Sequence, residues 1–318
     1  MCCHVSGMAN ELTLEDIKTI QYSRRLRASL QQTASRLRGR CRVRTGLRDK
    51  LVEISTIGKR TLTKSTDGKG QTPDNANTFQ KRWMYPEFYE DGYVHDKQFD
   101  LTSQLADQVF SETQDAMLAA CERTIDDRMV NALLGDALVG AHGTDKLALP
   151  SSQIVAVDAQ YEPLGKEETG IVTGLTFDKI RLAKRRLMKA EAMKRGDSAF
   201  LLVSVDQLMR MLGDEKASSE QYVAVKALID GDLKTFMGFE WIVTEALPYD
   251  EESKVRTCVA YVKDALEFGF WEESRSEISK RADKKNCPQI FTSIALGGVR
   301  AEDKGVVAIK CYEEADVA

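Results

Sequence analysis

The stretch LTSQLADQVFSETQDAMLAACERTIDDRMVNALL, residues 101–134, decides the fold of this chain. Neither proline nor glycine interrupts it, Thr102 or Ser103 can cap its start, and Gly135 follows its end. Its apolar residues fall mostly on one face of a helix: Leu105, Val109, Phe110, Ala116, Met117, Ala120, Ile125, Met129 and Leu133. Such a helix is about 50 Å long, whereas a compact chain of this length has a radius of gyration of only about 20 Å. We therefore expect an elongated, flattened molecule built around one long helix.

Residues 50–98, upstream of this helix, predict a long β-type excursion with two limbs. Leu51, Ile54 and Ile57 are interleaved with polar residues, and a turn-rich tract with its tip around residues 64–77 follows them. Aromatic residues then return: Phe79, Trp83, Tyr85, Phe88, Tyr89 and Tyr93. A two-stranded ribbon has no core of its own and is marginal in water. We therefore expect this excursion to lie on a partner.

Downstream of Pro150 the pattern is mixed α and β. Thr176 predicts the cap of a very basic amphipathic helix that runs to Lys194, and Ser204 or Asp206 predicts the start of a second helix. Residues 198–205 are nearly all apolar and predict a buried strand. Further strands are expected over residues 239–245, 256–262, 267–272, 290–296 and 305–312. The fold class expected is α+β.

The basic charge is concentrated near the N-terminus. Residues 21–50 carry ten basic side chains and one acidic one, while the rest of the chain has a net charge of −13. Apolar spacing predicts an amphipathic helix over residues 14–38, ended by Gly39. A basic arm of this kind fits an acidic partner, either nucleic acid or the acidic surface of a neighbouring subunit. Only Tyr22 could stack on a base, so base recognition is not expected and we favour the neighbouring subunit.

The composition is that of a soluble globular protein, with a net charge of −4, 42% apolar and 30% charged residues. No stretch approaches the roughly 20 apolar residues that a membrane helix needs, and the start lacks the pattern of a secretion signal. We therefore expect no membrane partner. The cysteines are odd in number, scattered and without a CxxC pair, which predicts free thiols: Cys2, Cys3, Cys41, Cys121, Cys258, Cys287 and Cys311.

Motifs that carry catalytic chemistry are missing from the sequence. It has no P-loop, GxGxxG, HExxH, GxSxG or EF-hand spacing. The pairs Asp126–Asp127 and Glu167–Glu168 read as solvated faces, and His95 beside Asp96 as a surface polar pair. We therefore expect no catalytic residue, no cofactor and no metal. An enzyme with an unrecognised site near Asp126, His142 or Asp206 is the least favoured hypothesis.

The order of these segments resembles the major capsid proteins of tailed bacteriophages with the HK97-like fold. Residues 231–239, followed by Leu247–Pro248, are similar to the segment where a loop leads into a central strand of these coat proteins. Residues 119–133 are similar to the end of their long spine helix. Residues 295–300 and 305–309, ALGGVR and GVVAI, resemble their C-terminal hairpin. The similarity covers nearly the whole chain in order.

The resemblance implies a capsid architecture and function. Its parts would be an N-terminal arm (1–50), an extended hairpin called the E-loop (51–98), a spine helix with the start of a peripheral domain (99–150), a mainly axial domain (151–260), and a return to the peripheral sheet with a C-terminal hairpin (261–318). The chain would assemble in the host cytoplasm into hexamers and pentamers that form an icosahedral shell around packaged double-stranded DNA. The alternative is a nucleic-acid-binding architectural protein that acts through residues 24–50.

The resemblance also implies partners. These are other copies of the chain, a portal protein and packaged double-stranded DNA bound non-specifically. Whether a decoration protein also binds is left undecided by the sequence. Only about a dozen residues precede the first expected helix, so we expect a separate scaffolding protein or none. Lys59, Lys64 and Lys69 could in principle form the covalent crosslinks of some relatives, but we expect ordinary surface lysines and a single band at monomer mass.

The residues expected at the subunit interface lie in the arm and in the excursion. We expect Arg38, Arg40 and Arg42 to contact an adjacent subunit or the lumen. The aromatic limb is expected to pack on a neighbour, and the lysines of the excursion to lie at the same contact: Trp83, Tyr85, Phe88, Lys59 and Lys64. Deletion of residues 60–76 should leave a folded protein that does not assemble.

Overall fold

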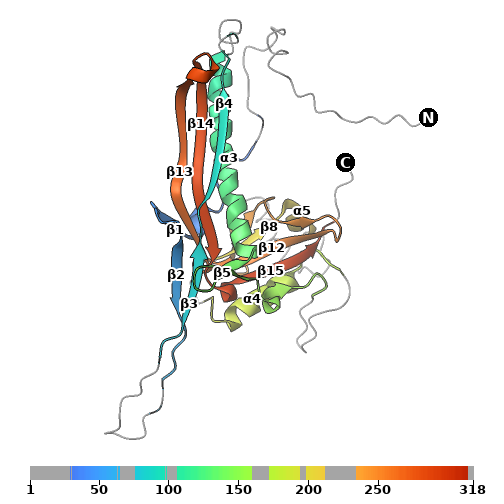
Figure 1. Ribbon diagram of the computed structural model, residues 1–318. Helices are drawn as coiled ribbons and strands as arrows, with labels where there is room; N and C mark the ends of the chain where they lie inside the picture. Colours follow the sequence, from blue (N-terminus) through green and yellow to red (C-terminus); the bar gives the residue numbers. More distant parts are fainter. Residues whose placement is uncertain are drawn as a thin grey trace, which may run out of the picture. The chain divides into compact units, whose positions relative to one another are not determined.

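The computed structural model contains helices and mixed sheets, which confirms the α+β class (Figure 1). It describes residues 29, 31–62, 64, 76–96, 98, 106–159, 172–193, 198–211 and 234–313. The chain divides into two units. Of the described residues, the first unit contains those up to Ala34 and those within 88–123 and 274–294, and the second contains those within 35–87, 124–273 and 295–313. The helix α3 and the strands β13 and β14 contribute residues to both units.

The long helix is confirmed as α3 (Ala106–Leu134), and residues 101–105 with the expected caps lie outside the described residues. Its buried stripe includes Ile125, Met129 and Leu133, all fully buried. The helix ends where predicted: the Gly135 N–H makes a last helical bond to the Asn131 carbonyl at 2.8 Å, and β5 (Ala137–Val139) follows.

The first unit is built from three strands and the N-terminal part of α3. A sheet of order β1-β13-β14-β4 supplies the strands, and its bounds are β1 (Arg42–Thr45), β13 (Leu266–Arg281), β14 (Cys287–Arg300) and β4 (Glu87–Val94). Within this unit the Gln114 side chain contacts Ser276 at 3.4 Å, and the His95 ring packs edge-on against Phe110 at 5.5 Å. These contacts join the helix to the sheet.

Two strands are longer than the sequence predicted. We expected strands over 267–272 and 290–296, but β13 and β14 extend to a turn at Lys285 and Asn286, which both have positive φ. The expectation was too short because β13 beyond its fifth residue is half-buried or exposed and carries charged side chains. Pairing with β14 holds this polar part in the strand without an apolar run.

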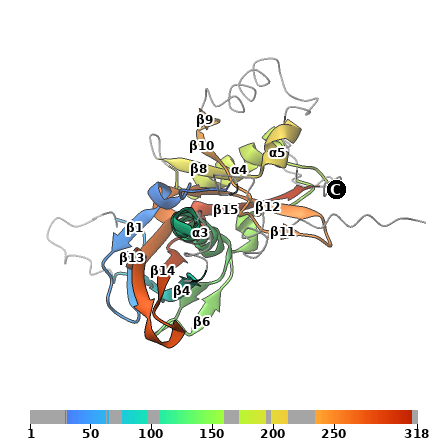
Figure 2. The ribbon, with the colours of Figure 1, turned by 90° about the horizontal axis from the view of Figure 1, so that it is seen from above.

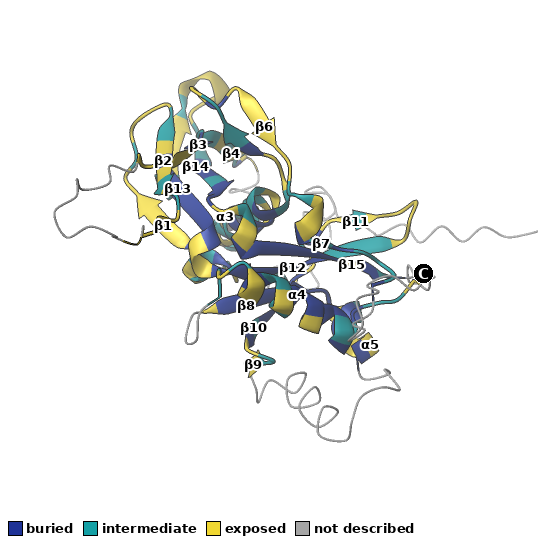
Figure 3. Cartoon of the chain, turned by 90° about the horizontal axis from the view of Figure 1, so that it is seen from below, coloured by how far each residue is buried: buried dark blue, intermediate teal, exposed yellow. Residues whose placement is uncertain are grey.

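The second unit contains a seven-stranded sheet of order β7-β15-β12-β8-β10-β9, with β11 paired to β12 (Figure 2). Every residue of β8 is buried, which confirms the predicted buried strand. The strands are β7 (Ile154–Val155), β8 (Ala199–Val203), β9 (Thr235–Phe236), β10 (Phe239–Val243), β11 (Tyr249–Asp250), β12 (Val255–Val262) and β15 (Val306–Tyr312). Figure 3 shows β8, β10, β15 and the second half of β12 as largely buried, whereas β9 and β11 are more exposed.

Two helices of this unit have the predicted caps. Thr176 accepts a hydrogen bond from the Lys179 N–H at the start of α4 (Phe177–Lys189), and Ser204 accepts one from Gln207 at the start of α5 (Val205–Arg210). The predicted extension of the first helix to Lys194 is wrong. The helix ends at Lys189 because Glu191 adopts a left-handed conformation and the next N–H groups bond back to Leu187.

A four-stranded sheet of order β2-β3-β5-β6 completes the second unit. Its strands are β2 (Val52–Ile57), β3 (Phe79–Met84), β5 (Ala137–Val139) and β6 (Asp145–Leu147). The excursion predicted over residues 51–98 is therefore shorter in the structure. Only β2 and β3 form a hairpin, whereas β4 pairs with β14 in the other sheet. The predicted aromatic limb is therefore divided. Trp83 lies in β3, Phe88 lies in β4, and Tyr85 lies between these two strands.

Five short 3-10 helices complete the described elements: one precedes β1, three connect strands of the second unit, and one lies at the β13–β14 turn. They span Arg38–Arg40, Ser151–Gln153, Lys263–Ala265, Asp303–Gly305 and Ala282–Lys284. The helix expected over residues 14–38 is wrong for the described residues 31–37, which are not helical. The backbone N–H groups of Arg36 and Leu37 bond to the Asp126 carboxylate instead of to a helical partner.

Three smaller expectations also have outcomes. The five cysteines within the described residues are free thiols, as predicted. His95 is not a surface residue, since it is 3% exposed and lies between the rings of Tyr93 and Phe110. Asp126 is not on a solvated face either, because it is 2% exposed, whereas Asp127 is exposed.

Candidate functional site

The arginines of residues 38–44, here called the arginine strap, pair with acidic residues of their own chain. The four arginines, at alternate positions of the strap, contact four different acidic residues. The strand β1, which contains two of them, pairs in parallel with the start of β13. The ion pairs are Arg38–Glu273 at 3.0 Å, Arg40–Glu240 at 2.8 Å, Arg42–Asp264 at 2.7 Å and Arg44–Glu267 at 2.8 Å. The acidic surface that the basic segment needs is therefore present within the same chain. A contact of Arg38, Arg40 or Arg42 with a neighbouring subunit stays a prediction.

Two of these arginines make further contacts. The Arg38 guanidinium lies 4.8 Å from the centre of the Phe270 ring, which adds a cation–π contact to its ion pair. The hydrogen bond that Arg42 donates to the Asp264 carboxylate raises the pKa of Arg42, so this guanidinium stays charged at any physiological pH. Each exposed ion pair contributes little to the free energy of folding. The strap is therefore held by several pairs together and not by one.

A buried carboxylate fixes the chain just before the strap. Asp126 on α3 accepts hydrogen bonds from the Ser35 hydroxyl at 2.6 Å, the Arg36 N–H at 3.0 Å and the Leu37 N–H at 3.1 Å. Hydrogen bonds to an ionised acceptor are the stronger class. The Leu37 side chain is 1% exposed and lies in the core. The hydrogen bonds to Asp126 and the burial of Leu37 together fix the position at which the strap begins.

The β2–β3 hairpin is covered by its own chain at its root, which is the end of the hairpin at Val52 and Met84. Its register runs from Val52 opposite Met84 to Ile57 opposite Phe79. Ile54 and Met84 are 2% and 1% exposed and share a small core with Ala137, Val299 and Ala301. The root is thus packed by residues from β5 and the end of β14.

The far end of the same hairpin is amphipathic and uncovered. Since residues of a strand alternate between faces, Ile57 and Phe79 share one face, and Thr56 and Gln80 share the other. The side chains of Ile57 and Phe79, here called the outer pair, are 65% and 59% exposed. An apolar cross-strand pair on one face with a polar pair on the other fits a ribbon that lies on an apolar surface.

The predicted interface aromatics differ in their surroundings. The Trp83 indole is 8% exposed and donates to the Gly140 carbonyl at 2.7 Å, and the Tyr85 hydroxyl donates to the His142 carbonyl at 2.7 Å. Trp83 is covered by its own chain, and Gly143 with its positive φ lies directly against it, whereas Tyr85 is only half-buried. Phe88 on β4 is instead 71% exposed. Their roles at an interface stay predictions, for which Phe88 has the more suitable exposure.

The two lysines predicted at the interface are both exposed. Lys59 follows β2 and pairs with Glu191 at 2.7 Å, while both side chains are more than two-thirds exposed. Lys64 is exposed as well. A pair of this exposure forms and breaks easily, so Lys59 can exchange its partner.

Sequence reasoning missed a buried arginine beside the root of the hairpin. Arg300 at the end of β14 is fully buried, and its guanidinium donates to the carbonyls of Leu133, Gly135 and Leu147 at 2.6–3.0 Å. Asp303 accepts from Arg300 at 2.6 Å and from Arg82 on β3 at 2.9 Å. Arg300 thereby caps the C-terminus of α3. A lone arginine in an apolar strand was the sequence signal that could have revealed this contact.

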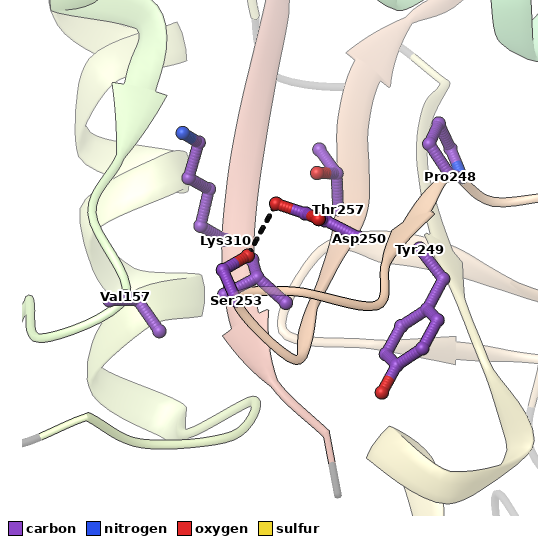
Figure 4. Close-up of a pocket in the computed structure, with 8 residues that line it drawn as sticks. Val157, Pro248, Tyr249, Asp250, Ser253, Thr257 and Lys310 are labelled. Atoms are coloured by element: carbon purple, nitrogen blue, oxygen red, sulfur yellow. Dashed lines mark hydrogen bonds between the residues drawn. The ribbon is translucent and has the colours of Figure 1, made fainter. Parts of the chain in front are cut away.

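A hollow of about 380 Å³ lies beside the β11–β12 turn (Figure 4). It is lined by Val157, Pro248, Tyr249, Asp250, Ser253, Val255, Thr257 and Lys310. The Ser253 hydroxyl donates to Asp250 at 2.6 Å, which lowers the pKa of that carboxyl and keeps it ionised. The hollow is lined by one acidic side chain, Asp250, and one basic side chain, Lys310. Its lining contains no cysteine or histidine.

The residues named for an unrecognised enzyme do not form such a site. The Asp126 carboxylate is engaged by three donors, as described above, and Asp206 lies in the first turn of α5. His142 lies in a loop, its ring 6.3 Å from that of Trp83. Among the described residues, no group of three or more His, Cys, Asp or Glu side chains could hold a metal ion.

The architecture defines a class of protein. A long helix beside a sheet, a separate sheet packed with helices, an outlying β-hairpin and an N-terminal strap are the parts of an HK97-like capsid subunit. The family model described as phage capsid protein matches residues 16–313, and the chain belongs to this family. It is therefore a structural protein of an icosahedral bacteriophage capsid, located in the virion.

Solved capsid structures share this fold at low sequence identity. The capsid of Ralstonia phage GP4 matches with a TM-score of 0.71 at 9% identity and covers 100% of both chains. The capsid of cyanophage P-SCSP1u matches with a TM-score of 0.62 at 11% identity and covers 93% of both chains. The mature capsid of bacteriophage PhiM1 matches with a TM-score of 0.60 at 12% identity and covers 92% of this chain and 91% of the other.

No curated protein matches this sequence significantly. Over the part of the chain that the structure describes, no helix is both long and apolar enough to cross a membrane.

Proposed function

We propose that this chain assembles into hexamers and pentamers that enclose packaged double-stranded DNA, as a structural subunit and not as an enzyme. The outer pair of the β2–β3 hairpin carries the proposal. Two large apolar side chains, each more than half exposed, lie at the end of a ribbon whose root alone is packed in its own chain. Identical copies are the partner, because a capsid is built from many copies of one subunit.

The domain assignment belongs to the same proposal. The β2–β3 hairpin corresponds to the extended loop expected over residues 51–98, and the seven-stranded sheet to the axial domain expected over residues 151–260. The other expected partners, a portal protein and a separate scaffolding protein, are part of it too. The alternative function, nucleic-acid binding through residues 24–50, is disfavoured because each of the four described arginines at alternate positions 38–44 pairs with an acid of its own chain.

Electron microscopy of the purified protein tests the proposal with a matched pair of variants. The double substitution Ile57→Asp and Phe79→Asp places charge on the face of the outer pair. The control, Thr56→Asp and Gln80→Asp, places the same charge on the opposite face at the adjacent register position. The expected result is closed shells from the native protein and the control, and unassembled but folded subunits from the outer-pair variant.

Two results would contradict the proposal. One is a native protein that stays monomeric at high concentration under conditions that favour assembly. The other is normal shells from the outer-pair variant, because the hairpin would then contribute nothing through that face.

A further inference from the structure

The floor of the hollow beside the β11–β12 turn is the seven-stranded sheet itself (Figure 4). Thr257 on β12 and Lys310 on β15 are directly opposite each other in the register, so their side chains lie on the same face of the sheet. The next opposite pair, Cys258 and Ile309, lies on the other face and is fully buried. Thr257 and Lys310 therefore line the hollow from two neighbouring strands.

One wall of the hollow is held in place by the rest of the chain. The Pro248 carbonyl accepts a hydrogen bond from the Thr257 N–H at 3.0 Å, and the Tyr249 hydroxyl donates to the Glu313 carbonyl at 3.2 Å. The Arg256 guanidinium lies 5.2 Å from the centre of the Tyr249 ring. Because this wall is already ordered, a ligand that binds against it does not have to order it.

The Asp250 carboxylate is the one acidic group of the lining, and its orientation is fixed. One of its oxygens accepts from the Ser253 hydroxyl at 2.6 Å, and the other accepts from the Glu252 N–H at 3.2 Å. The bond from Ser253 is the main cause that lowers the pKa of this carboxyl, so Asp250 is ionised at neutral pH. Among the described residues, Asp250 and Lys310 do not form an ion pair with each other. The hollow therefore presents an anion and a cation at separate places.

The rest of the lining is mainly apolar, with Val157, Pro248, Val255 and the ring of Tyr249. The volume of about 380 Å³ falls within the range of small-molecule sites, roughly 300–1,000 Å³. A ligand with a single charge would be attracted by one charged residue of the hollow and repelled by the other. The lining therefore fits a small molecule that carries both charges and an apolar group.

We propose that this hollow binds a zwitterionic molecule of the α-amino acid class with an apolar side chain. The ligand ammonium donates to the Asp250 carboxylate, and the ligand carboxylate accepts from the Lys310 ammonium and the Thr257 hydroxyl. The ligand side chain lies against Val157 and Val255. The inference is independent of the proposed function, because the lining includes no residue of the β2–β3 hairpin or the arginine strap.

Saturation-transfer difference NMR with the full-length protein and L-leucine as the probe tests the inference. Isoamylamine and isocaproate are the matched probes, since each has the same apolar group with only the ammonium or only the carboxylate. The test variants are Lys310→Gln and Asp250→Asn. The control is Lys304→Gln, which removes an exposed lysine outside the lining. Circular dichroism confirms that each variant is folded.

We expect L-leucine to bind the native protein and the control equally, and isoamylamine and isocaproate to bind more weakly. Lys310→Gln should weaken the binding of L-leucine about fivefold (~1 kcal/mol). Asp250→Asn should also weaken the binding of L-leucine, but it should strengthen that of isocaproate, because the repulsion between the two carboxylates is removed. A gain in binding cannot come from a variant that has merely lost its fold.

Three results would overturn the inference. These are no binding of L-leucine to the native protein, an equal loss of binding in Lys310→Gln and the control, and binding of isocaproate that Asp250→Asn leaves unchanged. The last result would show that the carboxylate of the hollow does not select the charge of a ligand.

Discussion

The arginine strap and the β2–β3 hairpin belong to the same unit, and they differ in where their side chains find partners. The strap is strongly charged, and four of its arginines have an acidic partner within the chain. The hairpin also carries charge near its far end, where Lys59 pairs with Glu191, but the apolar side chains of its outer pair stay exposed. The difference shows that a basic segment can have its acidic partners within its own chain, whereas two large apolar side chains of the hairpin are left exposed there. Exposed apolar side chains grouped on one face are typical of a surface that binds a partner.

The largest expected effect concerns the root of the hairpin. Replacement of Arg300 with methionine removes the donor to the carbonyls of Leu133, Gly135 and Leu147 and leaves Asp303 with Arg82 as its remaining partner. Removal of one partner from a buried charged network typically costs about 3–5 kcal/mol. We expect a loss of this size in the free energy of unfolding, measured by urea denaturation of the unassembled protein. A loss below about 1 kcal/mol would show that the root does not depend on this arginine.

A comparison within one strand sharpens the contrast between root and end. Ile54→Ala removes a side chain that is 2% exposed and should destabilise the subunit by about 2–4 kcal/mol. Ile57→Ala removes one that is 65% exposed and should change subunit stability by less than about 0.5 kcal/mol, while it weakens assembly. Equal losses of stability in urea would mean that the far end is covered by its own chain.

The anchor of the strap is expected to have an intermediate effect. Asp126→Asn removes the charge that accepts from Ser35 and two backbone N–H groups, at a cost of about 1–3 kcal/mol. Burial raises the pKa of the nearby Cys41 thiol to about 12, so this thiol should alkylate slowly in the native protein at pH 8. The variant should increase the rate of alkylation at Cys41, located by peptide mass spectrometry. An unchanged rate of alkylation would mean that the Asp126 carboxylate does not hold the strap in place.

The smallest expected effect belongs to a single strap pair. Arg40 and Glu240 are each about one-third exposed. A double-mutant cycle with Arg40→Gln and Glu240→Gln should give a coupling energy of about 0.2–1 kcal/mol that falls as salt increases. A coupling of several kcal/mol would mean that one pair alone fixes the strap.

The sequence was sufficient for elements whose signals are local. An uninterrupted run predicted α3, and Thr176 and Ser204 were correctly predicted as caps, because a helix and its cap depend on residues a few positions apart. The polar parts of β13 and β14 were missed, since pairing with a distant strand holds them without an apolar pattern.

The candidate site depended on contacts that sequence spacing does not reveal. The acids that pair with the strap lie about 200 or more residues away along the chain, so the sequence showed a basic segment without its partners. The contact of Trp83 with residues 140–143 could not be predicted either, because that loop is also distant along the chain. The opposite faces of Ile54 and Ile57 could have been predicted, because they are three positions apart in a strand.

Protection of the outer pair on assembly tests the central claim most directly. In Phe79→Cys the new thiol lies on the face of the outer pair, and in Gln80→Cys it lies on the opposite face. Maleimide labelling of each site, quantified by peptide mass spectrometry, is compared between unassembled subunits and closed shells. We expect the thiol at position 79 to react readily in subunits and to be protected at least tenfold in shells (~1.4 kcal/mol), with much weaker protection at position 80. Equal rates at position 79 in both states would contradict the account.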